Sequence, residues 1–291
     1  MNTFTIRDIE NLSGIKAHTL RVWEQRYGII RPMRKDSNHR LYGIEDLKQI
    51  LRISFLYNQG YKISRIAEMD ENEIKKLSLE FKPKGSYEVF INQMMEASMD
   101  FDEELFRSAM DNAMIHLGME KLMTLVIYPF LNKIGILWMT GNVIPSQEHF
   151  ASNIIRNKIL MATNQLPPKK NDEGKKYILF NPPGEYHEIP LLFVQYCLKQ
   201  RGISNILFGI DTSTDLLKEY LQKNKSTHLF LFMTTNFTNM QPMELLDDIR
   251  RNFPGLQIEV AGNSFRGVET EENSYTRIFR NVEDFISHLG N

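Results

Sequence analysis

The chain has 291 residues, enough for roughly two domains at about 150 residues each. Hydrophobic residues make up 42% and charged residues 24%, a globular composition that excludes a largely disordered or collagen-like chain. No apolar run approaches the ~18 residues of a membrane span, and the N-terminus lacks the apolar segment of a secretory signal. The single cysteine, Cys197, cannot form an internal disulfide. We therefore expect a cytoplasmic protein with no membrane segment.

Charge is distributed unevenly along the chain. Residues 1–66 contain 12 Lys and Arg against 6 Asp and Glu, a net charge of +6. The remaining residues contain 23 against 30, a net charge of −7. A basic head on an acidic body indicates that the head meets a polyanion.

The first predicted domain, residues 1–74, consists of short helices separated by turns. Leu20, Trp23 and Tyr27 share one face of a helix that begins near Lys16 and ends at Gly28. Residues 29–43 are irregular and basic. The predicted helices of this domain are residues 5–13, 16–27, 45–59 and 63–69.

Two helices joined near Gly14 predict a helix-turn-helix, whose second helix lies in the DNA major groove. On that helix Leu20, Val22 and Trp23 can pack inward. The basic loop that follows suits a wing lying along the DNA backbone, which gives salt-dependent affinity. A solvated basic face is the alternative interpretation. The candidate DNA-binding residues are Lys16, His18, Thr19, Arg21, Arg26, Arg34, Asn38, Arg40 and Tyr42.

Four strings of this head, at residues 5–9, 19–28, 38–42 and 60–64, resemble the winged helix-turn-helix of MerR-family regulators, and the resemblance covers residues 4–70. It implies a homo-oligomer, a dimer or tetramer, that binds double-stranded DNA at a pseudo-palindromic promoter or operator. The metal-sensing branch of that family uses cysteines after the head, and this chain has none there.

The second predicted domain, residues 75–167, is helical and rich in methionine, with room for a bundle of four or five helices. Its methionines either fill gaps in a core or line a face that contacts a cofactor.

A polar linker bounded by proline and glycine, residues 167–174, leads into the third predicted domain, residues 175–291. There, short apolar runs at 177–180, 206–209, 229–232 and 258–261 alternate with helices. This alternation predicts a doubly wound parallel sheet of flavodoxin-like type, which binds ligands beyond the carboxyl ends of its strands.

Two patterns in these domains carry candidate ligand contacts. Trp138 is followed after nine residues by Glu148 and His149, and Glu185-x-His187 comes directly after the first predicted strand. A histidine on such a loop can present a ring nitrogen to a metal while a neighbouring carboxylate holds the ring. Taken singly, the tryptophan fits a core and the histidines fit an exposed surface.

Together the two patterns resemble the cobalamin-binding module of methionine synthase. Behind a MerR-type head they resemble, over essentially the whole chain, the CarH/LitR group of light-dependent repressors. This implies cobalamin, in its adenosyl form, with His187 as lower axial cobalt ligand and Trp138 over the upper face. It also implies that Glu148 and His149 form an upper-face pair in which His149 can coordinate cobalt after photolysis. The remaining expected cofactor contacts are Glu185, Thr234 and Gly262.

The chain departs from that pattern at three places. Pro190 replaces the final glycine of the histidine motif and so lacks a backbone N–H. Thr234 stands where the pattern has a serine, and Gly262-Asn263 stands where it has two glycines.

The expected function is a DNA-binding transcriptional regulator, gated by cobalamin and possessing no enzymatic activity. One alternative is a MerR-type regulator whose body only oligomerises, without a cofactor. Another is a corrinoid-dependent enzyme or carrier protein. The predicted DNA-binding head and the lack of a catalytic domain argue against this alternative.

Overall fold

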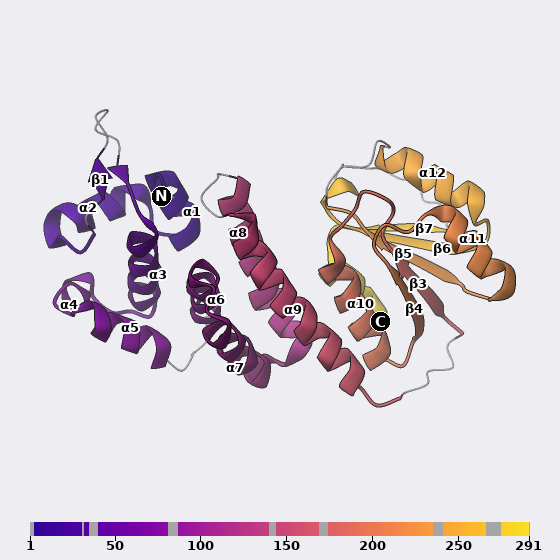
Figure 1. The fold of residues 1–291 in the computed structure, drawn as a ribbon, viewed down its shortest axis with the longest axis horizontal. Coiled ribbons are helices and arrows are strands. Elements are labelled where there is room, and N and C mark those ends of the chain that lie inside the picture. The colour runs from indigo at the N-terminus through magenta and orange to yellow at the C-terminus, as the bar shows by residue number, and fades with distance from the viewer. Residues whose placement is uncertain are drawn as a thin grey trace. The chain divides into compact units, whose positions relative to one another are not determined.

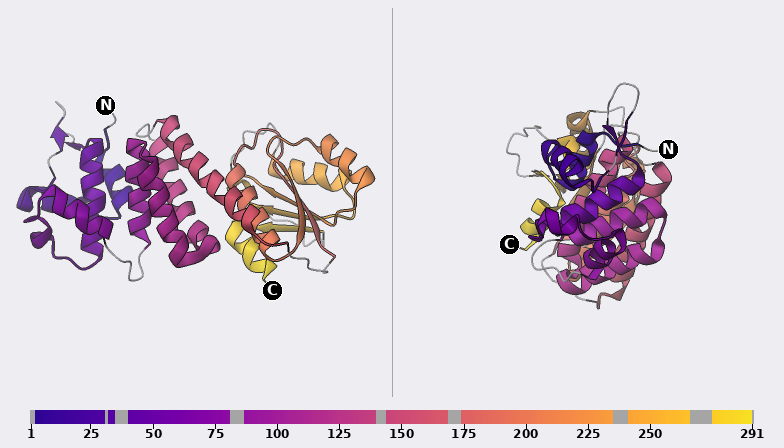
Figure 2. Two further views of the ribbon diagram at one scale, coloured as in Figure 1. Left: turned by 60° about the horizontal axis from the view of Figure 1, so that its bottom comes forward. Right: turned by 90° about the vertical axis from the view of Figure 1, so that its left-hand side faces the viewer.

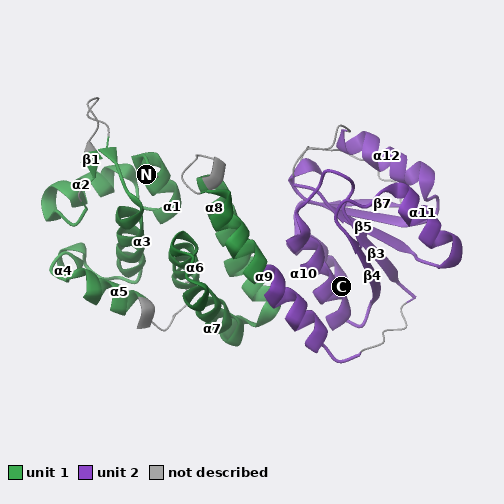
Figure 3. Cartoon of the chain, viewed as in Figure 1, with its two compact units in different colours: residues 1–154 green, residues 155–291 purple. Residues whose placement is uncertain are grey.

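The computed structural model describes residues 3–30, 32–34, 40–80, 87–139, 144–168, 174–234, 241–265 and 275–290, with the backbone alone at residues 34, 79, 80, 138 and 139. The chain forms two compact units, residues 1–154 and 155–291 (Figure 3). Unit 1 is helical apart from a small hairpin, and unit 2 is built on a parallel sheet (Figure 1). The predicted fold class, a winged helix-turn-helix, a helical middle and a doubly wound sheet, is confirmed.

Unit 1 begins with the head, the domain predicted to bind DNA. The helices of unit 1 are α1 (Ile6–Ser13), α2 (Ala17–Tyr27), α3 (Ile44–Asn58), α4 (Ile63–Ile66), α5 (Glu71–Glu80), α6 (Glu88–Asp100), α7 (Glu103–Leu122), the π-helical turn η1 (Met123–Ile127), α8 (Tyr128–Met139) and the start of α9 (Pro145–Gln165). β1 (Met33–Arg34) and β2 (Arg40–Leu41) pair antiparallel. The boundary predicted after residue 74 falls inside α5, a helix that packs on α3.

The head is assembled around α3. Trp23 of α2 is 3% exposed and meets Tyr57 edge-on, with 5.0 Å between ring centroids. Phe4 and Tyr42 exchange two backbone hydrogen bonds, of 2.8 and 3.0 Å, which join the segment before α1 to the end of the wing. Burial of Trp23, Phe4 and Tyr42, together with aliphatic side chains such as Ile9 and Leu20, holds α1, α2 and the hairpin on α3.

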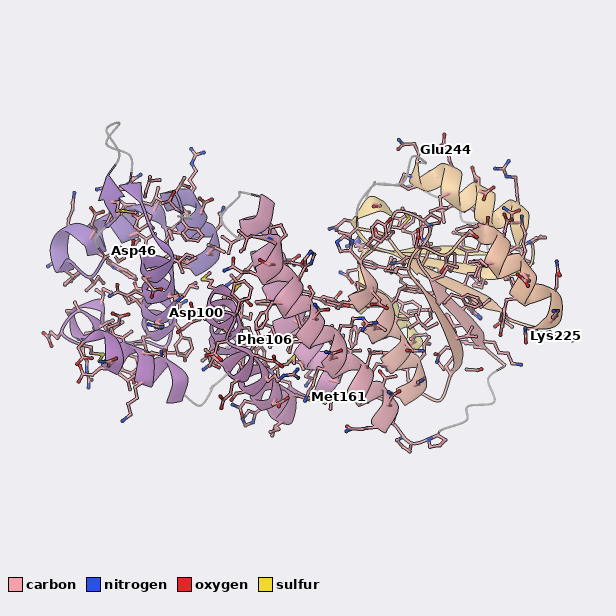
Figure 4. All side chains as sticks on the ribbon, in the orientation of Figure 1. Asp46, Asp100, Phe106, Met161, Lys225 and Glu244 are labelled. Atoms are coloured by element: carbon pink, nitrogen blue, oxygen red, sulfur yellow. The ribbon has the colours of Figure 1, made fainter. Side chains whose placement is uncertain are left out.

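Buried ion pairs connect the head to the following helices within unit 1. Arg52 of α3 and Glu96 of α6 are each 7% exposed, and Arg52 Nε donates to Glu96 Oε2 at 3.1 Å while Nη2 donates to Oε1. Lys48, also on α3, contacts Asp100 at the end of α6, which is labelled in Figure 4. Because charges this deep need partners, these contacts fix α3 against α6 in one arrangement.

The bundle core is aromatic and methionine-rich. Phe106 of α7, labelled in Figure 4, is fully buried and meets Phe130 and Phe150 edge-on at 5.5 and 6.1 Å between ring centroids. Six methionines between residues 94 and 123 are at most 7% exposed, namely Met94, Met95, Met99, Met110, Met119 and Met123. These methionines therefore fill gaps in the core, which is the first of the two interpretations given in the sequence analysis.

One helical run among the described residues, Glu103–Leu137, has the length and apolar composition of a membrane-spanning helix, in contrast to the expectation from apolar runs alone. It is not one regular helix. Gly118 leaves helical geometry at φ 71° and ψ 170°, and η1 adds a π-helical turn. Because a span needs every backbone group bonded within it, and because Phe106, Ala109 and Ala113 are buried against the bundle, we interpret this run as core helices.

Unit 2 contains a five-stranded parallel sheet. Its strands are β3 (Lys176–Phe180), β4 (Ser204–Gly209), β5 (His228–Phe232), β6 (Gln257–Ala261) and β7 (Thr276–Phe279), in the order β4-β3-β5-β6-β7. Its helices are α10 (Glu188–Gln200), α11 (Thr214–Lys223), α12 (Pro242–Asn252), the 3-10 turn η2 (Asn263–Phe265) and α13 (Val282–Leu289). The strand order is that of flavodoxin-like folds, in which ligands bind where the order reverses, at the ends of β3 and β5.

Helices cover both faces of this sheet. Leu217 of α11 and Leu246 of α12 join the strand side chains in one buried cluster. Helices α10 and α13 lie on the opposite face (Figures 1 and 2). The sequence analysis missed β7, because Thr276–Phe279 has only two strongly apolar residues and lies at the sheet edge beside β6.

The face of the sheet toward α13 contains a buried polar cluster. Glu259 of β6 is 1% exposed, and its carboxylate accepts a 2.9 Å hydrogen bond from the Tyr177 hydroxyl. Burial raises the pKa of Glu259, while Tyr177 and Arg277 oppose that rise. His228 stacks on Tyr177 with 4.5 Å between ring centroids, and burial lowers its pKa to about 4.

Candidate functional site

Helix α2, the predicted recognition helix, presents a basic surface. Leu20 and Trp23 are buried, whereas Lys16, His18, Arg21 and Arg26 are exposed and Thr19 is half-buried. Gly28 ends the helix in the left-handed conformation, at φ 63°. His18 and Arg21 lie on the side of α2 opposite Trp23, where they can approach phosphates or base edges, whereas Arg26, one turn after Trp23, lies nearer the buried side.

Two of the head residues lie differently from the sequence expectation. Val22 was predicted to pack inward but is 36% exposed, among the polar side chains of α2. Tyr42, a candidate DNA contact, is 1% exposed and belongs to the core beside Phe4, so the structure contradicts that role. An aromatic residue at the end of a basic loop gives no signal from sequence alone as to which side of the hairpin it occupies.

The wing is tied to the recognition helix. Arg40 of β2 donates from Nε to Glu24 Oε2 of α2 at 2.6 Å, with the two side chains only 20% and 14% exposed. This hydrogen bond raises the pKa of Arg40. Lys16 is likewise paired, with Glu10 at 3.0 Å, although its side chain is 81% exposed. The side chain of Arg34 and all of Asn38, both candidate DNA contacts, lie outside the described residues.

The upper-face pair lies at the start of α9. His149 Nδ1 is 3.0 Å from Glu148 Oε2, and the His149 side chain is 72% exposed. Glu148 also accepts a hydrogen bond from Ser152, one turn further on. A carboxylate held between two neighbours orients the imidazole. Trp138 lies near the end of α8, and its side chain is outside the described part of the chain.

In unit 2, the candidate metal ligand follows β3. His187 caps the N-terminus of α10, and its side chain is 49% exposed. Its Nδ1 lies 2.5 Å from Oε1 of Glu185, which is fully buried. The same oxygen accepts the backbone N–H of His187 at 3.0 Å. Ligation of a metal through Nε2 would keep both of these contacts.

Glu185 also reaches the next strand end. Its Oε2 accepts the backbone N–H of Thr234, just after β5, at 2.8 Å. Burial alone would raise the pKa of Glu185, but hydrogen bonds from His187 and Thr234 outweigh it and hold that pKa below its usual value. Thr234 therefore contributes its backbone N–H to this site.

The donor set fits a corrinoid better than a bare metal ion. Within the described ranges, no group of three or more His, Cys, Asp and Glu side chains is placed to hold a metal. A single half-exposed imidazole, held by a buried carboxylate, suits a metal whose other ligands come from a macrocycle. The residues present at the end of β3 thus fit an axial cobalt ligand.

The structure accounts for two positions of the cobalamin pattern, Pro190 and Gly262. Pro190 is the third residue of α10, where its missing N–H removes no bond inside the helix. Gly262 has φ 118°, and a Cβ there would stand 2.1 Å from the Met233 carbonyl oxygen. Only glycine fits that close approach of backbone to backbone, so the requirement for Gly262 comes from the join between β5 and β6.

Sequence reasoning missed one residue of this site. Asn181 is fully buried immediately after β3, and its side chain bonds to His187 and to β5. Asn181 begins the sequence Asn-Pro-Pro-Gly, which is typical of an ordinary turn. No sequence signal distinguishes a buried asparagine there from an exposed one.

Comparison with known proteins gives matches over both units. Residues 4–73 match the MerR HTH family regulatory protein model, and residues 90–162 match the B12 binding domain model. The HTH-type transcriptional repressor CarH of Myxococcus xanthus is 23% identical over 97% of this chain and 97% of its own length. The repressor CarA of the same organism is 27% identical over 74% of this chain and 71% of its own length.

Among solved structures, the monomethylamine corrinoid protein of Methanosarcina barkeri matches with a TM-score of 0.55 and 13% identity. The match covers 69% of this chain and 96% of that protein. At this identity the likeness concerns the fold. The chain therefore combines a MerR-type helix-turn-helix domain at residues 4–73 with a B12-binding domain at residues 90–162.

Proposed function

We propose that this chain is a transcriptional regulator whose head binds double-stranded DNA as a dimer and whose body binds cobalamin, which gates DNA binding. The observation that carries the proposal is His187, with Nδ1 held 2.5 Å from the fully buried Glu185 at the end of β3. The similarity to the repressors CarH and CarA supports DNA-binding regulation over enzymatic activity and favours a cytoplasmic protein.

For DNA, Arg21 is the leading contact, since it is exposed in the middle of α2. A dimer places two such helices on the two half-sites of a pseudo-palindrome. Lys16, His18, Thr19 and Arg26 lie on the same helix and support it. Arg40 acts through Glu24, by holding the wing against α2.

The DNA proposal is tested with duplexes that the wild-type protein selects from a randomised library. Arg21→Ala is expected to weaken binding by ~1–3 kcal/mol for a base contact, or to lower the salt slope by about one for a phosphate contact. Arg107→Ala, whose side chain on α7 is 41% exposed, is the matched control. Wild-type affinity and salt slope in Arg21→Ala would show that α2 is not the recognition helix.

For the cofactor, bound cobalamin would supply a cobalt ion that an imidazole nitrogen can ligate and, in its adenosyl form, a light-sensitive cobalt–carbon bond. His187 would ligate the cobalt, Glu185 would fix its ring, and Thr234 and Gly262 form the adjoining strand ends. Trp138, Glu148 and His149 remain the predicted contacts of the upper face, with His149 as a second cobalt ligand.

The cofactor proposal is tested by titrating the protein with adenosylcobalamin in the dark and recording the visible spectrum. His187→Ala should lose the spectrum of imidazole-ligated cobalamin and much of the affinity. His116→Ala, exposed on α7, is the matched control. Absence of binding by the wild type would leave a cofactor-free regulator. Binding that never alters DNA affinity would instead favour a carrier protein.

Light gating by adenosylcobalamin is the finer part of this proposal. An adenosyl group gives the dark and illuminated states different contacts with the protein, and such a difference is what a population shift requires. Gel filtration and DNA binding of the loaded protein, before and after green light, test it directly. Identical elution and identical affinity in both states would leave a cobalamin-binding regulator without a light switch.

A further inference from the structure

Asn181 joins three parts of unit 2 at the end of β3. It is fully buried, and its side-chain oxygen accepts the Phe232 N–H of β5 at 3.0 Å. Its side-chain nitrogen donates to the His187 carbonyl oxygen at 3.1 Å. Its backbone N–H donates to Gly209 at the end of β4, at 2.8 Å, and its carbonyl accepts from Thr212 at 3.0 Å. Both ends of the amide and both backbone groups therefore have partners.

Asn181 and Glu185 bond to different backbone groups of His187. Glu185 accepts the backbone N–H of His187, and Asn181 donates to its carbonyl. The peptide planes before and after His187 are thus both fixed, and with them the direction of its Cα–Cβ bond. Glu185 then fixes the ring through Nδ1. A metal ligand whose backbone and ring are both fixed needs little reordering when it coordinates.

We propose that Asn181 is a positioning residue for His187, one that sets the direction from which the imidazole meets the corrinoid. This inference rests on the proposed cofactor function. A single amide does this because it accepts from β5 and donates to the loop at the same time. An alanine makes neither bond, and an aspartate keeps the bond to Phe232 while setting a carboxylate against the His187 carbonyl.

The test compares Asn181→Asp, Asn181→Ala and the control Asn224→Asp. Asn224 also donates its side-chain N–H to a carbonyl, that of Tyr220 at 3.0 Å, but at the exposed end of α11. The probe is cobalamin, read by its visible spectrum and by the nitrogen splitting that an axial imidazole adds to the electron paramagnetic resonance of its Co(II) form. Urea midpoints identify the variants that remain folded.

In Asn181→Ala we expect bound cobalamin to lose most of the spectral signature of imidazole ligation. Its affinity for cobalamin should be about tenfold weaker. The amount of folded protein should equal that of the wild type. Asn181→Asp should lose more of the signature than Asn181→Ala, and Asn224→Asp should keep the wild-type spectrum and affinity. Full imidazole ligation and affinity in folded Asn181→Ala overturns the positioning role alone. Failure of the wild type to bind cobalamin, or a normal spectrum in His187→Ala, overturns the proposed cofactor site and this inference with it.

Discussion

The ion pair between Arg52 and Glu96 should determine much of the stability of unit 1. Replacing Glu96 by leucine leaves Arg52, which is 7% exposed, with Glu71 as its one remaining ion-pair partner among the described residues, 3.6 Å away and 65% exposed. Breaking a buried pair by removing one partner costs about 3–5 kcal/mol. Because Glu71 stays, we expect the lower value, ~3 kcal/mol. In a unit of this size that lowers the melting temperature by about 6–12 °C.

The double variant Arg52→Met/Glu96→Leu separates the charge effect from the packing effect. Replacing both charges by apolar side chains of similar volume is often neutral or stabilising, so we expect it to return to within about 1 kcal/mol of wild type. Glu103→Leu is the matched control, because its partner Arg107 is 2.7 Å away at an exposed position and such pairs contribute at most ~1 kcal/mol.

The assay is thermal and urea unfolding followed by tryptophan fluorescence. The chain has two tryptophans, Trp23 and Trp138, and both belong to unit 1, so the signal reports that unit alone. A loss below 1 kcal/mol in Glu96→Leu would refute the reasoning that Arg52 depends on this partner. So would a double variant as unstable as the single one.

Three further predictions follow from contacts described above. Glu24→Gln removes a negative charge from the DNA-binding head, which by charge alone strengthens DNA binding, but it also releases Arg40 and the wing. We expect several-fold weaker DNA binding in an electrophoretic shift assay. Tighter binding would show that the Arg40–Glu24 pair does not hold the wing for DNA binding. Tyr177→Phe removes the 2.9 Å hydrogen bond to buried Glu259 and should cost ~1–3 kcal/mol in urea unfolding, whereas an unchanged midpoint would argue against it. Because burial lowers the pKa of His228 to about 4, the unfolded chain binds its proton first, and stability falls as pH drops from 6.5 towards 4. His228→Gln should flatten that fall between pH 7 and 5, and an equal slope in both proteins would count against this origin.

The sequence predicted the fold where local patterns are strong. Helical spacing and glycine stops placed α2, and apolar runs placed β3 to β6 within one or two residues. It missed β7, whose weakly apolar strand depends on pairing with β6. It did not identify α5, which spans the boundary predicted after residue 74 and packs against α3.

For the site, the sequence identified residue types and left their environments undetermined. Glu185 and His187 were selected from their spacing, and the structure shows how they are held. The burial of Tyr42 and the Arg40–Glu24 pair are tertiary features, since each joins residues that do not share a local pattern. Asn181 belongs to the same class, because its partners lie 6 and 51 residues further along the chain.

The continuity of α9 governs how this protein can be divided into fragments. The two units meet between Ile154 and Ile155, inside a helix that runs unbroken from Pro145 to Gln165. A cut there would expose both isoleucines, which are 4% and 1% exposed in the intact chain, and would leave two helical stubs too short to stay folded in water. Expression fragments, domain exchanges and inserted reporter sequences should therefore be joined beyond Leu166, so that all of α9 remains with the N-terminal piece.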